Sequence, residues 1–297
     1  MDARLAGLEL GGTKAIAVLG DGQTIIARET FPTTTPGETL GRVAECLRSW
    51  NAEEPIAAAG IASFGPVRVD PAAADYGRIL ATTKPGWEGA DPLGAVRGAL
   101  GCPVALDTDV NGAALAEHAL GAAQGCTSAV YLTIGTGLGG GVLVEGLPVH
   151  GAVHPEIGHV RLRRAQGDGF AGNCLFHGDC IEGLIAGPAL AARFGCPPAQ
   201  VPEDDPRWDL VAHDLAELLA TLLMALSPQR IVLGGGVTLR QPHLLPRALE
   251  HVPAKLGGYL SGLNGNALRE IVVLAGLGDD AGPLGALVLA KRALERG

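Results

Sequence analysis

Two short glycine turns, each between apolar strand-like runs, constrain the fold of this chain more than any other feature. Gly11-Gly12-Thr13-Lys14 is the first turn and Gly135-Thr136-Gly137 begins the second, with flanking runs at residues 6–10 and 15–19, then 129–134 and 142–144. Apolar runs on both sides of a glycine turn predict a β-hairpin. Because the second unit echoes the first about half a chain later, the pattern indicates an internal duplication of one α/β unit.

Helical and strand-like segments alternate in the rest of the chain. Apolar residues recur every three or four positions in residues 38–50, 112–120, 210–226 and 283–296, whereas short buried strands are expected at 57–62, 104–106, 231–233 and 271–274. This alternation predicts an α/β fold. We expect two α/β domains, residues 1–110 and 111–283, with the closing helix at about 284–297 packing back on the first.

Composition narrows the class of protein. The chain has 297 residues, 47% hydrophobic and 18% charged, so a folded protein with real cores is expected. The formal charge of −9 and the lack of a basic stripe argue against nucleic acid as a partner. The uncharged stretch at 126–144 has the length of a membrane span, but five glycines interrupt it, which favours two strands and a turn. With no secretory signal apparent, we expect a cytoplasmic protein without membrane contact.

The glycine turns are candidate phosphate sites. Successive glycines let backbone N–H groups face an anion, and Thr13 adds a hydroxyl donor; the alternative is an ordinary glycine hairpin. A P-loop is excluded, because Thr13 precedes Lys14 and a strand follows instead of a helix. The fingerprint of dinucleotide-binding folds is disfavoured at Gly135 for the same reason. Two such hairpins, together with later glycine turns at 234–236 and 276–278, indicate a bound nucleotide.

Asp107 and Asp109 stand where a predicted strand meets a predicted helix. A carboxylate at such a strand end can project into a site and accept a proton as a general base. The alternative is that either Asp caps the helix that follows. Only one of the two needs to be catalytic.

Cysteines and histidines are concentrated in one short segment. Cys174, His177 and Cys180 have the spacing Cys-x2-His-x2-Cys, and His159 lies upstream. Two thiolates and two imidazoles can close a tetrahedral zinc site, so we predict structural zinc rather than a chance grouping. His154 is the alternative to His159 as the fourth ligand.

Five motifs together resemble the ROK family of sugar kinases. They are Leu8-Glu9-Leu10-Gly11-Gly12-Thr13-Lys14, Thr108-Asp109-Val110-Asn111, Gly135-Thr136-Gly137-Leu138-Gly139-Gly140-Gly141, Glu156-Ile157-Gly158-His159 and Cys180-Ile181-Glu182. The resemblance implies the two-domain, actin-like ATPase fold of the ribonuclease-H type with a central cleft. It also implies ATP, Mg2+ and Zn2+, and phosphorylation of a hexose hydroxyl. A homodimer is expected as well.

The resemblance assigns roles residue by residue. Asp109 matches the catalytic base, and Glu156, His159 and Glu182 match sugar-contacting residues, with His159 also a zinc ligand. The expected phosphate-binding residues are Gly11, Gly12, Thr13, Lys14, Gly135, Thr136 and Gly137, and Gly235 and Gly236 match the turn on the adenosine side. Further substrate contacts are expected at Gly65, Pro66, Thr83 and Thr108.

Departures from the glucokinase pattern indicate the substrate. Thr108 and Thr83 stand where family glucokinases usually carry Asn, and the motifs as a whole are similar to the bacterial fructokinase branch. We therefore expect an ATP:D-fructose 6-phosphotransferase. A glucokinase or mannokinase of the same family is the alternative. A non-catalytic sugar-sensing protein is an alternative of another class, against which Asp109 argues, because a sensor needs no base.

Overall fold

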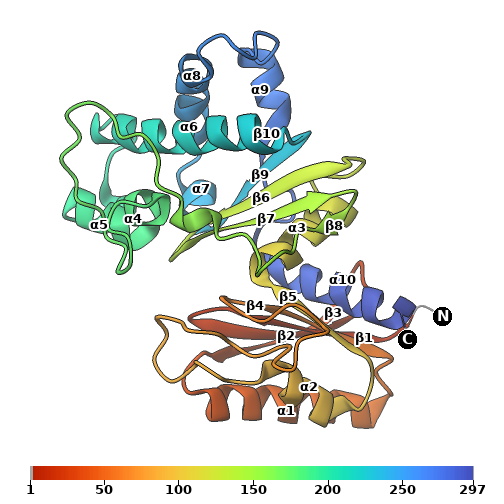
Figure 1. The fold of residues 1–297 in the computed structure, drawn as a ribbon. Helices are drawn as coiled ribbons and strands as arrows, with labels where there is room; N and C mark the ends of the chain where they lie inside the picture. The colour runs from red at the N-terminus through yellow and green to blue at the C-terminus, as the bar shows by residue number, and fades with distance from the viewer. Residues whose placement is uncertain (1–2, 297) are drawn as a thin grey trace. The chain divides into compact units, whose positions relative to one another are not determined.

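The computed structural model describes residues 3–296, which form two compact units of α/β structure (Figure 1). Unit 1 comprises Met1–Gln124, Gly141–Pro155 and Asp279–Gly297, and unit 2 comprises Gly125–Gly140 and Glu156–Gly278. The units therefore interleave along the chain more than the expected ranges of 1–110 and 111–283 do.

A five-stranded mixed sheet forms the centre of unit 1. Its strands lie in the order β3-β2-β1-β4-β5, with bounds β1 Leu5–Leu10, β2 Lys14–Gly20, β3 Ile25–Pro32, β4 Ala58–Ser63 and β5 Val104–Thr108. The first three strands form an antiparallel meander, and β4 and β5 run parallel to β1. Helices α1 (Pro36–Glu53) and α2 (Pro92–Leu100) cover one face of this sheet, and α10 (Ala281–Arg296) covers the other (Figure 1).

The second sheet has the same topology as the first. Its order is β10-β9-β6-β7-β8, with bounds β6 Ser128–Ile134, β7 Leu138–Val144, β8 Leu147–Pro148, β9 Arg230–Gly234 and β10 Val272–Leu274. Read from β8, the order 8-7-6-9-10 matches 3-2-1-4-5, with β9 parallel to β6 and β10 parallel to β9. Each sheet thus begins with a three-strand meander and adds two parallel strands beside the first strand. This repetition agrees with the duplication inferred from the glycine turns.

Helices make up most of the remainder of unit 2. Their bounds are η1 Ile157–His159, α4 Ile181–Ile185, α5 Gly187–Phe194, η2 Pro198–Gln200, α6 Arg207–Leu226, α7 Gly236–Arg240, α8 Leu244–Leu256 and α9 Gly265–Ile271. The long α6 is apolar on a broad face, buries eleven residues and packs against α8 and α4. A further short turn, η3 (Gly278–Asp280), precedes α10.

Backbones approach one another unusually closely where α10 and α3 (Asp109–Leu120) meet β4. A Cβ atom on Gly60 of β4 would lie 2.0 Å from the Ala286 carbonyl oxygen, and one on Gly285 of α10 would lie 2.2 Å from the Gly112 carbonyl of α3. Only glycine fits at such distances. The C-terminal helix is therefore seated directly on the N-terminal sheet and on the helix that begins at Asp109.

Most expected elements are present, and the structure adds others and changes one assignment. The first hairpin and the helices near 38–50, 112–120, 210–226 and 283–296 are confirmed. Gly139, Gly140 and Gly141 were expected in a turn but lie within β7, where neighbouring residues leave no room for a side chain at Gly140 or Gly141. Strands β3 and β8 and helices α2, α4, α5, α7, α8 and α9 were not predicted. None of the described helices is long and apolar enough to cross a membrane.

Substitution of Gly60 tests the close packing under α10. Gly60→Ala places a methyl group against the backbone of Ala286, so we expect a loss of about 3 kcal/mol in the free energy of unfolding. Gly98→Ala is the control, because Gly98 lies in α2 with open space around its Cβ position, and it should stabilise by about 0.5–1 kcal/mol. Thermal and urea unfolding measure both. Equal stability of the two variants would contradict this packing.

Candidate active site and metal centre

The first glycine hairpin presents an exposed turn between β1 and β2. Gly12, Thr13 and Lys14 are exposed, and a Cβ on Gly12 would meet nothing within 4 Å. The turn is closed by the Gly11 N–H, which donates to the Lys14 carbonyl at 2.9 Å, and by the Thr33 hydroxyl, which donates to the Gly11 carbonyl at 2.8 Å. The turn is therefore fixed at its base and open at its tip.

Two side chains tie the loop before α2 to this hairpin and to the segment that follows β3. Lys84 Nζ donates to the Gly12 carbonyl at 2.6 Å and to the Thr33 carbonyl at 3.2 Å. The buried Trp87 donates from Nε1 to the Thr34 carbonyl at 2.8 Å. The exposed Thr83, an expected substrate contact, directly precedes Lys84. Gly65 and Pro66, also expected contacts, follow β4 and are joined by a cis peptide bond.

The junction of β5 and α3 carries the candidate base. Thr108 ends the strand and caps the helix, since its hydroxyl accepts a hydrogen bond from the Asn111 N–H at 3.1 Å. Asp109 is the first residue of α3, and its Oδ1 accepts from the Val110 N–H at 2.9 Å. Thr108 is only 2% exposed, so its hydroxyl serves the helix cap in this structure.

Asp107, in β5 two residues before Asp109, is buried and is not an exposed base. Its side chain is 5% exposed and lies 3.0 Å from His150 Nε2. The hydrogen bond that the Asp107 carboxylate accepts raises the pKa of His150 above its usual value. Of the two aspartates that the sequence offered, Asp109 has the more accessible position at the helix start.

In unit 2 the second hairpin and the later glycine turn lie side by side. A Cβ on Gly135 would lie 3.7 Å from the Gly236 nitrogen, and Gly235, at φ 86°, has Ile134 backbone atoms 2.5 Å from its Cβ position. The structure thus brings together Gly135, Gly235 and Gly236, three of the residues expected to bind nucleotide.

Glu182 of α4 reaches the same hairpin. Its Oε2 accepts a hydrogen bond from the Leu138 N–H at 2.9 Å, next to Thr136 and Gly137. The second expected sugar-contacting acid, Glu156, is exposed and directly precedes η1, the turn that carries His159. The carboxylate of Glu182 therefore links the loop after Cys180 to the start of β7.

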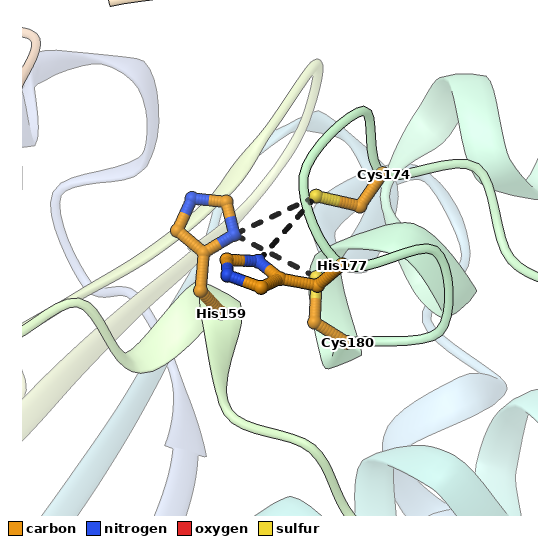
Figure 2. Close-up of side chains that lie close together, drawn as sticks. All are labelled: His159, Cys174, His177 and Cys180. Atoms are coloured by element: carbon orange, nitrogen blue, oxygen red, sulfur yellow. Dashed lines mark hydrogen bonds between the residues drawn. The ribbon is translucent and has the colours of Figure 1, made fainter. Parts of the chain in front are cut away.

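The four predicted zinc ligands are brought together in unit 2, as Figure 2 shows. One ligand atom from each of His159, Cys174, His177 and Cys180 lies within 4.8 Å of the others. His159 Nδ1 is 3.7 Å from Cys174 Sγ and 3.6 Å from Cys180 Sγ, and His177 Nδ1 is 3.9 Å from Cys174 Sγ. The alternative ligand, His154, lies in unit 1 and accepts from the Val67 N–H at 3.2 Å.

These separations fit a tetrahedral metal ion. Zinc bonds to sulfur and to imidazole nitrogen imply a sulfur-to-nitrogen edge of about 3.6 Å in a tetrahedron. The loop is shaped for this by paired backbone hydrogen bonds between Cys174 and Gly178, at 3.1 and 3.0 Å. Burial raises the pKa of the Cys180 thiol to about 11 in the absence of an ion.

Two chemically important residues received no role from the sequence. Glu9, near the end of β1, is half-buried, and its buried Oε2 atom has no hydrogen-bond partner within residues 3–296; desolvation raises its pKa. His150 contacts Asp107 across 43 positions of the chain. Glu9 could have been noticed as an acid in an apolar strand, whereas no local pattern marks His150.

The fold and these motifs together define an α/β sugar kinase. The model of the ROK family matches residues 5–293, so the chain belongs to the ROK family. The predicted family and the predicted actin-like α/β fold class are thereby confirmed.

Known proteins resemble the chain over nearly its whole length. A putative fructokinase of Bacillus subtilis (strain 168) is 41% identical over 98% of this chain and 96% of its own. The fructokinase of Zymomonas mobilis is 41% identical over 96% of both chains. Among solved structures, the ROK hexokinase from Thermus thermophilus has 31% identity and a TM-score of 0.77, with 99% of this chain and 100% of that chain covered.

Proposed function

We propose that this protein is an ATP-dependent fructokinase, which converts D-fructose and ATP to fructose 6-phosphate and ADP. The observation that carries this proposal is the 41% identity to proteins named fructokinase over nearly the full length of both chains. Thr83 and Thr108 support it, because they stand where the glucokinase pattern has Asn. Glucose and mannose kinases of the same family are the competing assignments. The homodimer stays a prediction.

Asp109 is the proposed general base. It accepts the proton of the fructose O6 hydroxyl as O6 bonds to the γ-phosphorus of ATP and the bond from that phosphorus to the β-phosphate oxygen breaks. Its place at the start of α3 suits this role, since the junction with β5 leaves no flexible loop between them. Glu156, His159 and Glu182 are the proposed sugar-contacting residues of unit 2.

The glycine hairpins are the proposed phosphate-binding elements. The exposed N–H groups around Gly12, Thr13 and Thr136 are donors that suit phosphoryl oxygens. Mg2+ would reduce the charge repulsion at the γ-phosphate, and Glu9 is the carboxylate that fits it best. A buried carboxylate oxygen without a partner is costly unless it is protonated or meets a cation, and Glu9 Oε2 is in that position.

His159, Cys174, His177 and Cys180 are the proposed zinc ligands. Two sulfurs and two ring nitrogens form a complete tetrahedral set with no open position, which is typical of structural rather than catalytic zinc. Zinc there would fix the loop that leads into Glu182 and the turn that carries Glu156 and His159. Its proposed role is therefore to hold sugar-contacting side chains in place.

A substrate comparison tests the proposed function. We expect kcat/KM for fructose to exceed that for glucose by tenfold or more, because an unmatched buried hydroxyl partner costs about 1–3 kcal/mol. Fructose, glucose, mannose and N-acylated hexosamines are compared under one condition with ATP, with and without Mg2+, which should be required. A preference for glucose would reassign the substrate. No turnover of any sugar would favour a sensor.

Asp109→Asn tests the base. The amide keeps the shape of the side chain but cannot take the proton, so kcat should fall roughly 100- to 10,000-fold while fructose binding is retained. Asp209→Asn is a matched control, because Asp209 also lies in the first turn of a helix and makes only a surface ion pair with Arg247. Steady-state kinetics and calorimetric sugar binding measure the two effects. Near-normal turnover of Asp109→Asn would exclude this base.

Metal analysis tests the zinc centre. Purified protein should contain about one zinc per chain, and Cys174→Ser should lose it. Its melting temperature should fall by roughly 5 °C or more, since each kcal/mol is worth about 2–4 °C in a protein of this size. Cys196→Ser, a half-buried cysteine outside the cluster, is the control and should keep the metal. Zinc-free protein with freely reactive Cys174 and Cys180 would refute the site.

A further inference from the structure

One buried carboxylate gathers hydrogen bonds from both sides of the candidate base. Asp107 is 4% exposed. Its Oδ1 accepts from the Thr108 N–H at 2.8 Å and from Asn111 Nδ2 at 2.7 Å, and His150 Nε2 lies 3.0 Å from Oδ2. Thr108 precedes Asp109 and Asn111 follows it by two residues. The Asp107 carboxylate is therefore hydrogen-bonded to residues on both sides of Asp109.

Of the three donors that the described residues bring to Asp107, only His150 comes from outside the β5–α3 junction. It lies beyond β8 in a segment of unit 1 that His154 also fastens, through Val67. Strand β7 packs directly against the first turn of α3, since a Cβ on Gly141 would lie 2.4 Å from the Val110 carbonyl oxygen. The first turn of α3 is thus held from β7 and from His150.

Other charged or titratable groups around Asp107 do not replace His150. Arg292 of α10 is an electrostatic neighbour of Asp107, but its guanidinium donates to the Gly146 carbonyl at 2.8 Å. The Tyr76 hydroxyl, a further neighbour of Asp107, accepts from the Leu106 N–H at 3.1 Å. His150 is 36% exposed at its side chain and contributes its Nε2 edge to Asp107.

We propose that His150 is a positioning residue for phosphoryl transfer. By donating from Nε2, it holds Asp107 in place, and Asp107 in turn holds the peptide and the side chain that flank Asp109. Small displacements of a catalytic group lower the rate of the chemical step more than they weaken substrate binding. The imidazolium and the neutral Nε2–H tautomer can both donate this bond, so the role does not depend on the charge of His150. The proposal rests on the proposed function of Asp109.

Three substitutions at His150 distinguish the need for a hydrogen-bond donor at the position of Nε2 from the need for a charged ring. The amide nitrogen of Gln reaches the place of Nε2, whereas that of Asn ends near Nδ1 and Ala offers no donor. We expect His150→Ala and His150→Asn to lower kcat about tenfold, the scale of one lost hydrogen bond to a charged group. KM for fructose and for ATP should change less than about twofold on this view, since substrate contacts are intact. His150→Gln should keep more than half of the wild-type kcat.

The control is His251→Ala, a histidine on α8 whose ring faces His213. Its kcat should equal that of the wild type. If His150→Ala fails to fold, His150→Asn carries the comparison. The proposal is overturned if both variants keep kcat within twofold of wild type. It is also overturned if Gln is as poor as Asn, or if the loss appears in KM alone.

A double-mutant cycle tests whether His150 acts through Asp109. In the Asp109→Asn background, His150→Asn should cause no further loss of kcat, because there is no base left to position. An undiminished further loss would show that His150 acts independently of Asp109 and would overturn the proposal. Failure of the proposed function looks different: the wild-type protein itself would not phosphorylate fructose, or Asp109→Asn alone would remain active.

Discussion

The close approach of three backbones at glycine is the constraint on which unit 1 depends. Gly60 of β4, Gly112 of α3 and Gly285 of α10 allow the C-terminal helix to lie directly on the sheet and on the helix that carries Asp109. Helix α10 is buried along most of one side and contacts β1, β4, β5 and α3. Because interiors are packed as tightly as organic crystals, a methyl group at these positions would force α10 or α3 to shift. The position of the candidate base is therefore set by packing of residues more than 170 positions later in the chain.

In unit 2, side-chain clusters rather than close backbone packing fix the segment that precedes α4. The segment from Val160 to Cys180 has little regular secondary structure, and its fixed points are the His159, Cys174, His177 and Cys180 cluster and a chain of buried ion pairs. Arg193 contacts both Asp168 and Asp214, and all three are at most 5% exposed at their side chains. Arg164 extends this chain from Asp168 toward Asp179, next to Cys180. Breaking one partner of such a buried set is costly, because an uncompensated charge remains. The ion pairs and the proposed metal thus both fix the segment from Val160 to Cys180.

Local patterns in the sequence were sufficient for the hairpins, for several of the long helices and for the grouping of Cys174, His177 and Cys180, but not for contacts between distant segments. The Cys-x2-His-x2-Cys spacing lies within one loop, so its grouping could be predicted, and the structure brings the four side chains together. Strand β3 was missed because its residues are mostly half-buried or exposed and show no continuous apolar run. Gly140 and Gly141 were assigned to a turn because the nearness of Ile157 and Val110, which explains glycine inside a strand at these two positions, is a tertiary property. The contact between His150 and Asp107 escaped for the same reason.

Charge explains why glycine turns, rather than basic side chains, are the proposed binding elements for ATP. The chain carries nine more acidic than basic residues. Four of the acidic residues are proposed to take part in binding or catalysis: Glu9, Asp109, Glu156 and Glu182. Lys84, near the first hairpin, donates to two backbone carbonyls and so stiffens the turn. Oriented N–H groups stabilise phosphate oxygens without bringing a mobile cation that would pair with the neighbouring carboxylates. Backbone donors and a metal ion are therefore the proposed means by which this acid-rich kinase site binds ATP.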